Sequence, residues 1–150
     1  MASPTILIVE DEGFVATLLT RVLKAGGYEV LDARTGAEAL ALGRLHRGEI
    51  ALLLCDIGLP DLSGPDVVLR LGEFCPRVRT LFTSGYPLDI LAERRLLPPE
   101  ILQDENTFYI PKPFLPKELL GLVNSIFSMQ TEVATARTAR EGAARVSAAH

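Results

Sequence analysis

Short apolar stretches alternate with longer amphipathic stretches along most of the chain. The short ones are rich in aliphatic, β-branched and aromatic residues, which is typical of strands. They are Thr5–Val9, Tyr28–Ala33, Ala51–Cys55, Val78–Thr83 and Thr107–Pro111. Stretches such as TILIV and ALLLC do not alternate apolar with polar residues, which favours a parallel sheet covered on both faces.

Between these predicted strands the apolar residues recur at helical spacing. The first helix places Val15, Leu18, Leu19 and Val22 at i, i+3, i+4 and i+7, and Gly26-Gly27 is expected to end it. Further helices are predicted over Gly36–Arg47, Gly64–Phe74 and Pro116–Ser128. Strict alternation of strand and helix predicts a doubly wound α/β sheet.

Two parts of the chain depart from this alternation. Residues 87–106 contain only a weak helical pattern followed by a break at Pro98-Pro99. Residues 129–150 are rich in Ala, Arg and Thr and have too few apolar residues to form a core. We therefore expect one domain over residues 4–128 and a flexible or loosely helical tail.

Composition and charge exclude several classes of function. The chain has 150 residues and a formal net charge of -4, which argues against the excess of basic residues expected of a nucleic-acid-binding protein. No apolar run approaches the roughly 20 residues of a membrane span, and no positively charged leader precedes the first strand, so a cytoplasmic protein is expected. The chain has two cysteines and two histidines, whose spacing does not match a zinc site and argues against a Ser-His-Asp triad.

Polar residues gather where the predicted strands end. Glu10-Asp11-Glu12 follows the first strand, Asp56 the third, Thr83-Ser84 closes the fourth and Lys112 follows the fifth. Ligands of open α/β sheets bind at this carboxyl edge. Crowded carboxylates require a cation, and oxygen ligands suit Mg²⁺. Asp56 could then act as a nucleophile that forms an acyl phosphate, with a lysine to neutralise phosphoryl oxygens.

Four segments, ILIVEDE, CDIGLPDLSG, FTSGYP and YIPKPF, resemble in order and spacing the signature segments of response-regulator receiver domains of two-component signalling. The resemblance covers residues 4–128. It implies a flavodoxin-like, five-stranded parallel sheet with strand order 2-1-3-4-5 and helices on both faces. It also implies a phosphoacceptor signalling protein rather than an enzyme.

The resemblance further implies the roles of individual residues. Asp56 matches the phosphoacceptor, Glu10 and Asp11 match the Mg²⁺-holding acidic pair, and the backbone carbonyl of Gly58 matches the group that completes the metal shell. Lys112 matches the phosphate-binding lysine, and its bond to Pro113 matches a peptide bond that is usually cis.

Two other positions match the residues that move on phosphorylation in receivers. Thr83 matches the switch hydroxyl and Tyr109 the switch aromatic; the alternative is that Tyr109 is only a partly buried strand aromatic. Glu12 could be a metal ligand or a first-turn helix acid. Cys55 is expected to be a packed core thiol.

The resemblance implies partners as well. A sensor histidine kinase or a histidine phosphotransfer protein would phosphorylate Asp56, and the protein would be a monomer or weak dimer. No output segment is recognised, so a stand-alone regulator that signals to an unknown downstream protein is expected. Residues 87–106 are longer than in a typical receiver, and we expect them to carry the output surface. The alternative is that their apolar residues cover the sheet as an irregular fourth helix.

Three rival interpretations remain open. A flavodoxin-like FMN carrier would share the fold, but it needs a hydroxyl- and glycine-rich phosphate loop after the first strand. In this chain that loop is EDEG, whose negative charge would repel phosphate. A phosphatase of the haloacid dehalogenase type requires a second Asp where this chain has Gly58. A degenerate receiver that signals by binding alone is weakened because every residue needed for the chemistry is present.

Overall fold

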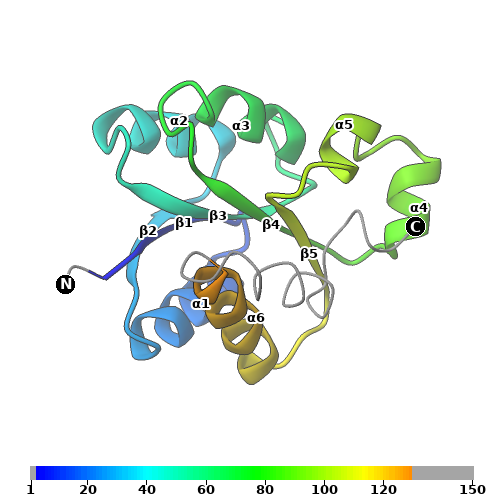
Figure 1. Cartoon of the computed structure of the whole chain (residues 1–150). Helices are drawn as coiled ribbons and strands as arrows, with labels where there is room; N and C mark the ends of the chain where they lie inside the picture. Colours follow the sequence, from blue (N-terminus) through cyan, green and yellow to red (C-terminus); the bar gives the residue numbers. More distant parts are fainter. Residues whose placement is uncertain (1–2, 130–150) are drawn as a thin grey trace.

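The structure, a computed structural model, describes residues 3–129, which form a five-stranded parallel sheet between two layers of helices (Figure 1). The strands are β1 (Thr5–Val9), β2 (Glu29–Ala33), β3 (Ile50–Asp56), β4 (Arg79–Ser84) and β5 (Thr107–Pro111). Their order is β2-β1-β3-β4-β5, so the predicted flavodoxin-like topology is confirmed. The predicted tail, apart from Met129, lies outside the described residues.

Helices cover both faces of the sheet (Figure 1). On one face lie α1 (Gly13–Ala25) and α6 (Pro116–Ser128), and on the other α2 (Gly36–Leu45) and α3 (Gly64–Leu71). The last two end two or three residues earlier than predicted, at the caps His46 and Gly72. None of the helices in the described range is long and apolar enough to cross a membrane.

Successive strand residues point into two separate cores. Leu7 and Leu53 belong to the cluster under α2 and α3, whereas Ile6 and Ile8 belong to the cluster under α1 and α6. Side chains of a strand alternate between faces, so both faces must be apolar when both are covered. The continuous apolar runs of the sequence have this cause.

The buried face of α1 differs from the predicted one. Its buried residues are Ala16, Leu19 and Leu23, while Leu18 is 44% exposed. The prediction followed only the large apolar side chains and missed that a small residue, Ala16, faces the sheet. Leu18 is therefore an exposed apolar residue near the carboxyl edge of the sheet.

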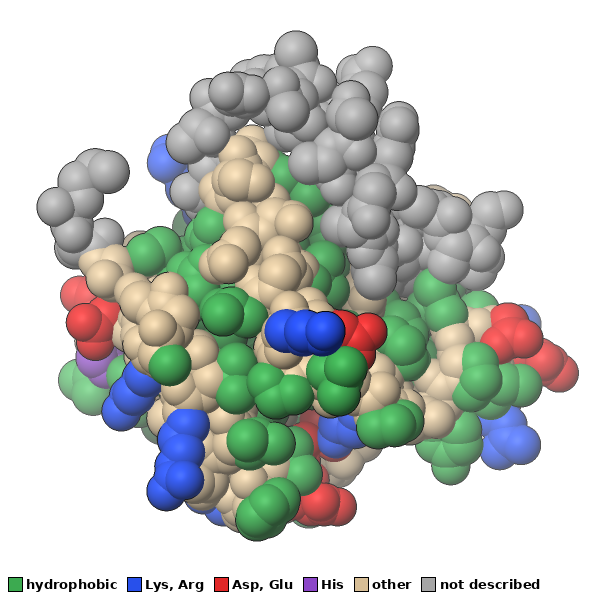
Figure 2. Space-filling view, turned by 90° about the horizontal axis from the view of Figure 1, so that it is seen from below, with side chains coloured by type: hydrophobic (Ala, Val, Ile, Leu, Met, Phe, Trp, Pro, Cys, Tyr) green, Lys and Arg blue, Asp and Glu red, His purple; other side chains and the backbone are tan. Residues whose placement is uncertain are grey.

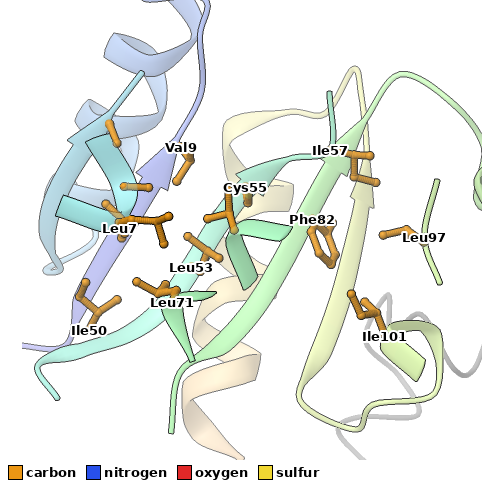
Figure 3. Packing of buried hydrophobic residues seen from close by; sticks show 14 of the residues in the cluster. Leu7, Val9, Ile50, Leu53, Cys55, Ile57, Leu71, Phe82, Leu97 and Ile101 are labelled. Atoms are coloured by element: carbon orange, nitrogen blue, oxygen red, sulfur yellow. The ribbon is translucent and has the colours of Figure 1, made fainter. Parts of the chain in front are cut away.

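Residues 87–106 form two short helices, α4 (Leu88–Glu93) and α5 (Pro99–Leu102), separated at the predicted proline break. Most of their apolar side chains are buried in the core cluster that contains Phe82: Leu91, Leu97, Ile101 and Leu102. Figure 3 shows Leu97 and Ile101 beside Phe82 of β4. Leu96, which lies between the two helices, is exposed at 40%. The segment therefore covers the sheet, as the alternative interpretation predicted.

Candidate functional site

The carboxyl edge of the sheet brings three of the predicted residues together. Glu10 directly follows β1, and its N–H donates to the Ala33 carbonyl at 3.0 Å. Asp56 is the last residue of β3, and Lys112 directly follows β5 with its N–H donating to the Ser84 carbonyl at 2.8 Å. These backbone hydrogen bonds extend the pairing of the strands by one residue. They therefore fix the backbone positions from which the side chains of Glu10 and Lys112 extend.

Lys112 contacts two carboxylates at once. Its Nζ donates to Glu10 Oε1 at 2.8 Å and to Asp56 Oδ2 at 3.1 Å. The side chain of Glu10 is 2% exposed, that of Asp56 16% and that of Lys112 27%. Glu10 is thus sheltered from solvent, while Asp56 and Lys112 remain partly accessible.

The electrostatics of this cluster follow from burial and charge. Burial raises the pKa of Glu10, and the nearby Asp56 charge raises it further, against the lowering effect of Lys112. Burial alone would lower the pKa of Lys112, but its hydrogen bonds to both carboxylates raise that pKa overall. The lysine therefore stays cationic and compensates only part of the negative charge.

The same acids fit a divalent cation. Glu10, Asp11 and Asp56 each offer an oxygen, and these oxygens lie within 4.8 Å of one another. A hard cation such as Mg²⁺ takes one or two carboxylates together with water and phosphate oxygens. Glu12 lies outside this group; it precedes the first residue of α1, and its N–H donates to Glu10 Oε2 at 3.1 Å.

The loop after β3 reaches back to the Asp56 carboxylate. The N–H of Gly58 donates to Asp56 Oδ1 at 3.1 Å, so the two carboxylate oxygens have different donors. A Cβ atom added at Gly58 or at Gly85 would meet no atom within 4 Å. The space beside both glycines is therefore open, and the role of the Gly58 carbonyl stays a prediction.

Thr83 and Tyr109 lie on the strands beside Asp56. Thr83 is the register partner of Asp56 on β4 and is 2% exposed. Tyr109 is also buried, and its hydroxyl donates to the backbone carbonyl of Tyr86 and, at 3.4 Å, to that of Ser84. The strand β5 is thereby tied to the loop after β4, while the switch roles of both residues stay predictions.

Two further sequence predictions concern residues beside the site. Cys55 is fully buried, and burial raises the pKa of its thiol, so the core-thiol prediction is confirmed. The bond between Lys112 and Pro113 is cis, as the resemblance implied.

Sequence reasoning missed an apolar groove that reaches the site. It is lined by Val15, Leu18, Leu19, Lys112, Pro113 and Phe114. Phe14, at 84% exposure, lies on the neighbouring surface of α1. The signal was present in the predicted apolar stripe itself, because Val15, Leu18 and Leu19 line the groove. Figure 2 shows hydrophobic side chains on this side of the molecule.

Comparison with known proteins decides the family. Residues 6–124 match the model of the response regulator receiver domain. The chain belongs to this family. Receiver domains belong to the response regulators of two-component signalling. As a class, they interact with histidine kinases or phosphotransfer proteins.

Curated relatives of this receiver domain are longer proteins. It is 34% identical over 128 residues to the sensor kinase CckA of Brucella abortus (strain 2308), covering 85% of this chain and 13% of that protein. It is 33% identical over 135 residues to the aerobic respiration control protein ArcA of Escherichia coli (strain K12), covering 90% of this chain and 53% of that protein. The chain thus spans about half or less of these relatives.

Solved receiver domains match nearly along their whole length. The receiver domain of the hybrid histidine kinase CckA superimposes with a TM-score of 0.68 at 31% identity, covering 81% of this chain and 97% of that one. A CheY-like receiver from Methanospirillum hungatei JF-1 gives 0.67 at 26% identity, covering 85% and 96%.

Proposed function

We propose that this receiver domain, over residues 4–128, accepts one phosphoryl group on Asp56 in a Mg²⁺-dependent reaction with a phosphorylated histidine. The observation that carries the proposal is the arrangement around Asp56. One carboxylate oxygen is bound by Lys112, the other by the Gly58 N–H, and two further acids lie within reach of a shared cation.

The chemistry is an in-line transfer. A lone pair of an Asp56 oxygen forms the P–O bond while the P–N bond of the phosphohistidine breaks, and its electron pair stays on the ring nitrogen. The donor leaves as neutral imidazole when its other ring nitrogen carries a proton. Glu10, Asp11, Asp56 and the Gly58 carbonyl would hold Mg²⁺, which when bound supplies positive charge beside the phosphoryl oxygens. Lys112, whose Nζ already donates to Asp56 Oδ2, would donate to a phosphoryl oxygen.

The reaction is stoichiometric rather than a turnover reaction. The acyl phosphate on Asp56 is the signalling state, and its loss by hydrolysis resets the protein. Gly58 and Gly85 carry no side chain and the space beside each is open, so we expect water to reach the acyl phosphate. The protein is therefore a phosphoacceptor and not an enzyme that acts on a separate substrate.

The donor is proposed to dock along α1. Any phosphohistidine must reach Asp56, and the apolar groove beside Lys112 continues onto the exposed Phe14 and Leu18. A sensor kinase or phosphotransfer protein with an apolar surface next to its histidine fits this rim. We further propose a cytoplasmic monomer or weak dimer that signals to a downstream protein, without nucleic-acid or membrane contacts.

The phosphoacceptor is tested by intact-mass spectrometry. Acetyl phosphate with Mg²⁺ should add one phosphoryl group to the protein and none to Asp56→Ala. The matched control is Asp66→Ala, which changes an exposed acid on α3. Equal labelling of Asp56→Ala would overturn the assignment.

The docking proposal is tested separately. Phe14→Ala should slow transfer from a phosphorylated histidine kinase and leave labelling by acetyl phosphate unchanged. Leu69→Ala, which changes another exposed apolar residue, at 65%, on α3, is the control. The proposal fails when both variants accept the phosphoryl group from the kinase at the wild-type rate.

A further inference from the structure

The loop between β3 and α3, residues 57–63, is tied at its tip to the beginning of α2. Asp61 makes both contacts with its carboxylate: Oδ1 accepts the N–H of Gly36 at 2.8 Å, and Oδ2 accepts the N–H of Ala37 at 2.9 Å. These N–H groups belong to the first turn of a helix and have no partner within it. A residue 24 or 25 positions away in sequence thus completes the start of α2.

A close side-chain contact accompanies these hydrogen bonds. A Cβ atom at Gly36 would lie 2.8 Å from Cβ of Leu62, which is closer than real Cβ atoms approach one another. Leu62 itself packs against the core cluster below α2 and α3. The absence of a side chain at Gly36 therefore lets the loop lie directly on the helix.

Helix capping alone does not account for this arrangement. The side chain of Thr35 already caps α2 locally by accepting the N–H of Glu38 at 3.1 Å. The hydrogen bonds to Gly36 and Ala37 lower the pKa of Asp61, which keeps this carboxylate ionised at neutral pH. Asp61 therefore adds a long-range tie to a helix that already has its own cap.

The other end of the same loop lies at the functional site. Gly58 donates to Asp56 Oδ1 at 3.1 Å and forms a β-bridge with Ser63. Gly64 N–H donates to the Ile57 carbonyl at 3.0 Å, which closes the base of the loop. With its base closed and its tip bound to α2, the loop has little freedom left at Gly58.

We propose that Asp61 is a positioning residue of the phosphorylation site. By clamping the loop to α2 it holds the backbone of Gly58 where the cation and the phosphoryl group require it. The inference rests on the proposed function, because it assigns a role toward that same site. Outer residues that orient metal ligands typically change affinity tenfold or more when they are removed.

The test compares Asp61→Ala with Thr35→Ala. Each variant removes one cap of the same helix, but only Asp61 belongs to the loop that carries Gly58. We expect Asp61→Ala to weaken Mg²⁺ binding, measured by calorimetric titration, about tenfold. Labelling by acetyl phosphate at saturating Mg²⁺ should also become slower. Thr35→Ala should lower the urea midpoint of unfolding and leave Mg²⁺ affinity and labelling unchanged.

Asp61→Asn provides the second variant in case the alanine protein does not fold. Its side-chain carbonyl oxygen can still accept one of the two N–H groups, so its Mg²⁺ affinity should lie between those of wild type and Asp61→Ala. If Asp61→Asn and Asp61→Ala reduce only the unfolding midpoint, as Thr35→Ala does, Asp61 is a helix cap and the inference is wrong. If wild type binds Mg²⁺ but takes no phosphoryl group, the proposed function fails, while the affinities still decide the role of Asp61.

Discussion

Lys112 Nζ lies 2.8 Å from Glu10 Oε1, so the lysine of the site is bound to an acid of the expected metal group as well as to Asp56. Its charge is therefore held in place before any phosphoryl group arrives. Lys112→Ala should slow labelling by acetyl phosphate about 10²-fold, the usual cost of removing one preorganised donor. The rate is measured by intact mass over time.

Lys117→Ala is the control for this prediction, because Lys117 is an exposed lysine in the first turn of α6. It should label at the wild-type rate. Similar rates for Lys112→Ala and Lys117→Ala would show that the lysine does not assist transfer.

Mg²⁺ should stabilise the folded receiver. Glu10, Asp11 and Asp56 lie close together, and Lys112 bonds to only two of these three acids, so a bound cation relieves repulsion that the unfolded chain does not have. At ten times its dissociation constant Mg²⁺ should raise the free energy of unfolding by about 1.4 kcal/mol. Urea unfolding with Mg²⁺ or EDTA measures this. Asp11→Asn should lose most of the increase, and an equal increase in that variant would contradict the ligand assignment.

Thr83 should separate switching from chemistry. It is the buried register partner of Asp56, and the proposed switch role expects its hydroxyl to bind a phosphoryl oxygen after transfer. Thr83→Ala should still be phosphorylated but should lose most of the NMR shift changes around Tyr109, because the differential contact is gone. Thr80→Ala, a buried threonine earlier on the same strand, is the control and should respond like wild type. Wild-type shifts in Thr83→Ala would refute the switch role.

Residues 92–105 should report phosphorylation by hydrogen exchange. These residues belong to the connection between β4 and β5, whose helices α4 and α5 have only six and four residues. Short helices beside a site belong to the less stable parts of a fold. Their amide protection should change more on phosphorylation than that of residues 41–45 at the end of α2. Equal and negligible changes in both would leave this segment with a structural role only.

Arg95 should be a site of backbone strain. It has a φ of 57°, a left-handed conformation that costs residues with a side chain about 1–2 kcal/mol. Arg95→Gly should raise the free energy of unfolding by about 0.5–1 kcal/mol, after allowance for the greater freedom of glycine in the unfolded chain. The control is Arg94→Gly at a φ of -85°, which should lower it by a similar amount. Urea unfolding decides, and a loss of stability in both variants would contradict the prediction.

Much of this protein was determined by its sequence alone. Apolar runs in which polar residues do not alternate indicated a sheet buried on both faces. The regular succession of strand and helix along the chain indicated that the strands are parallel. Because parallel strands all end at one edge, the positions of Glu10, Asp56 and Lys112 in the sequence were enough to predict that they meet. These are properties of periodicity and of strand direction, which the chain carries locally.

Other features were decided only by tertiary structure. The pairing of Lys112 with Glu10 depends on side-chain reach across the edge, and the contact of Asp61 with Gly36 depends on how a loop lies on a distant helix. The exposure of Leu18 and the burial of Leu97 likewise depend on which neighbour each helix meets. Periodicity fixes that a face is apolar, but it does not fix the rotation of a helix, the path of a loop or the partner of a charge. These follow from packing between segments far apart in the sequence.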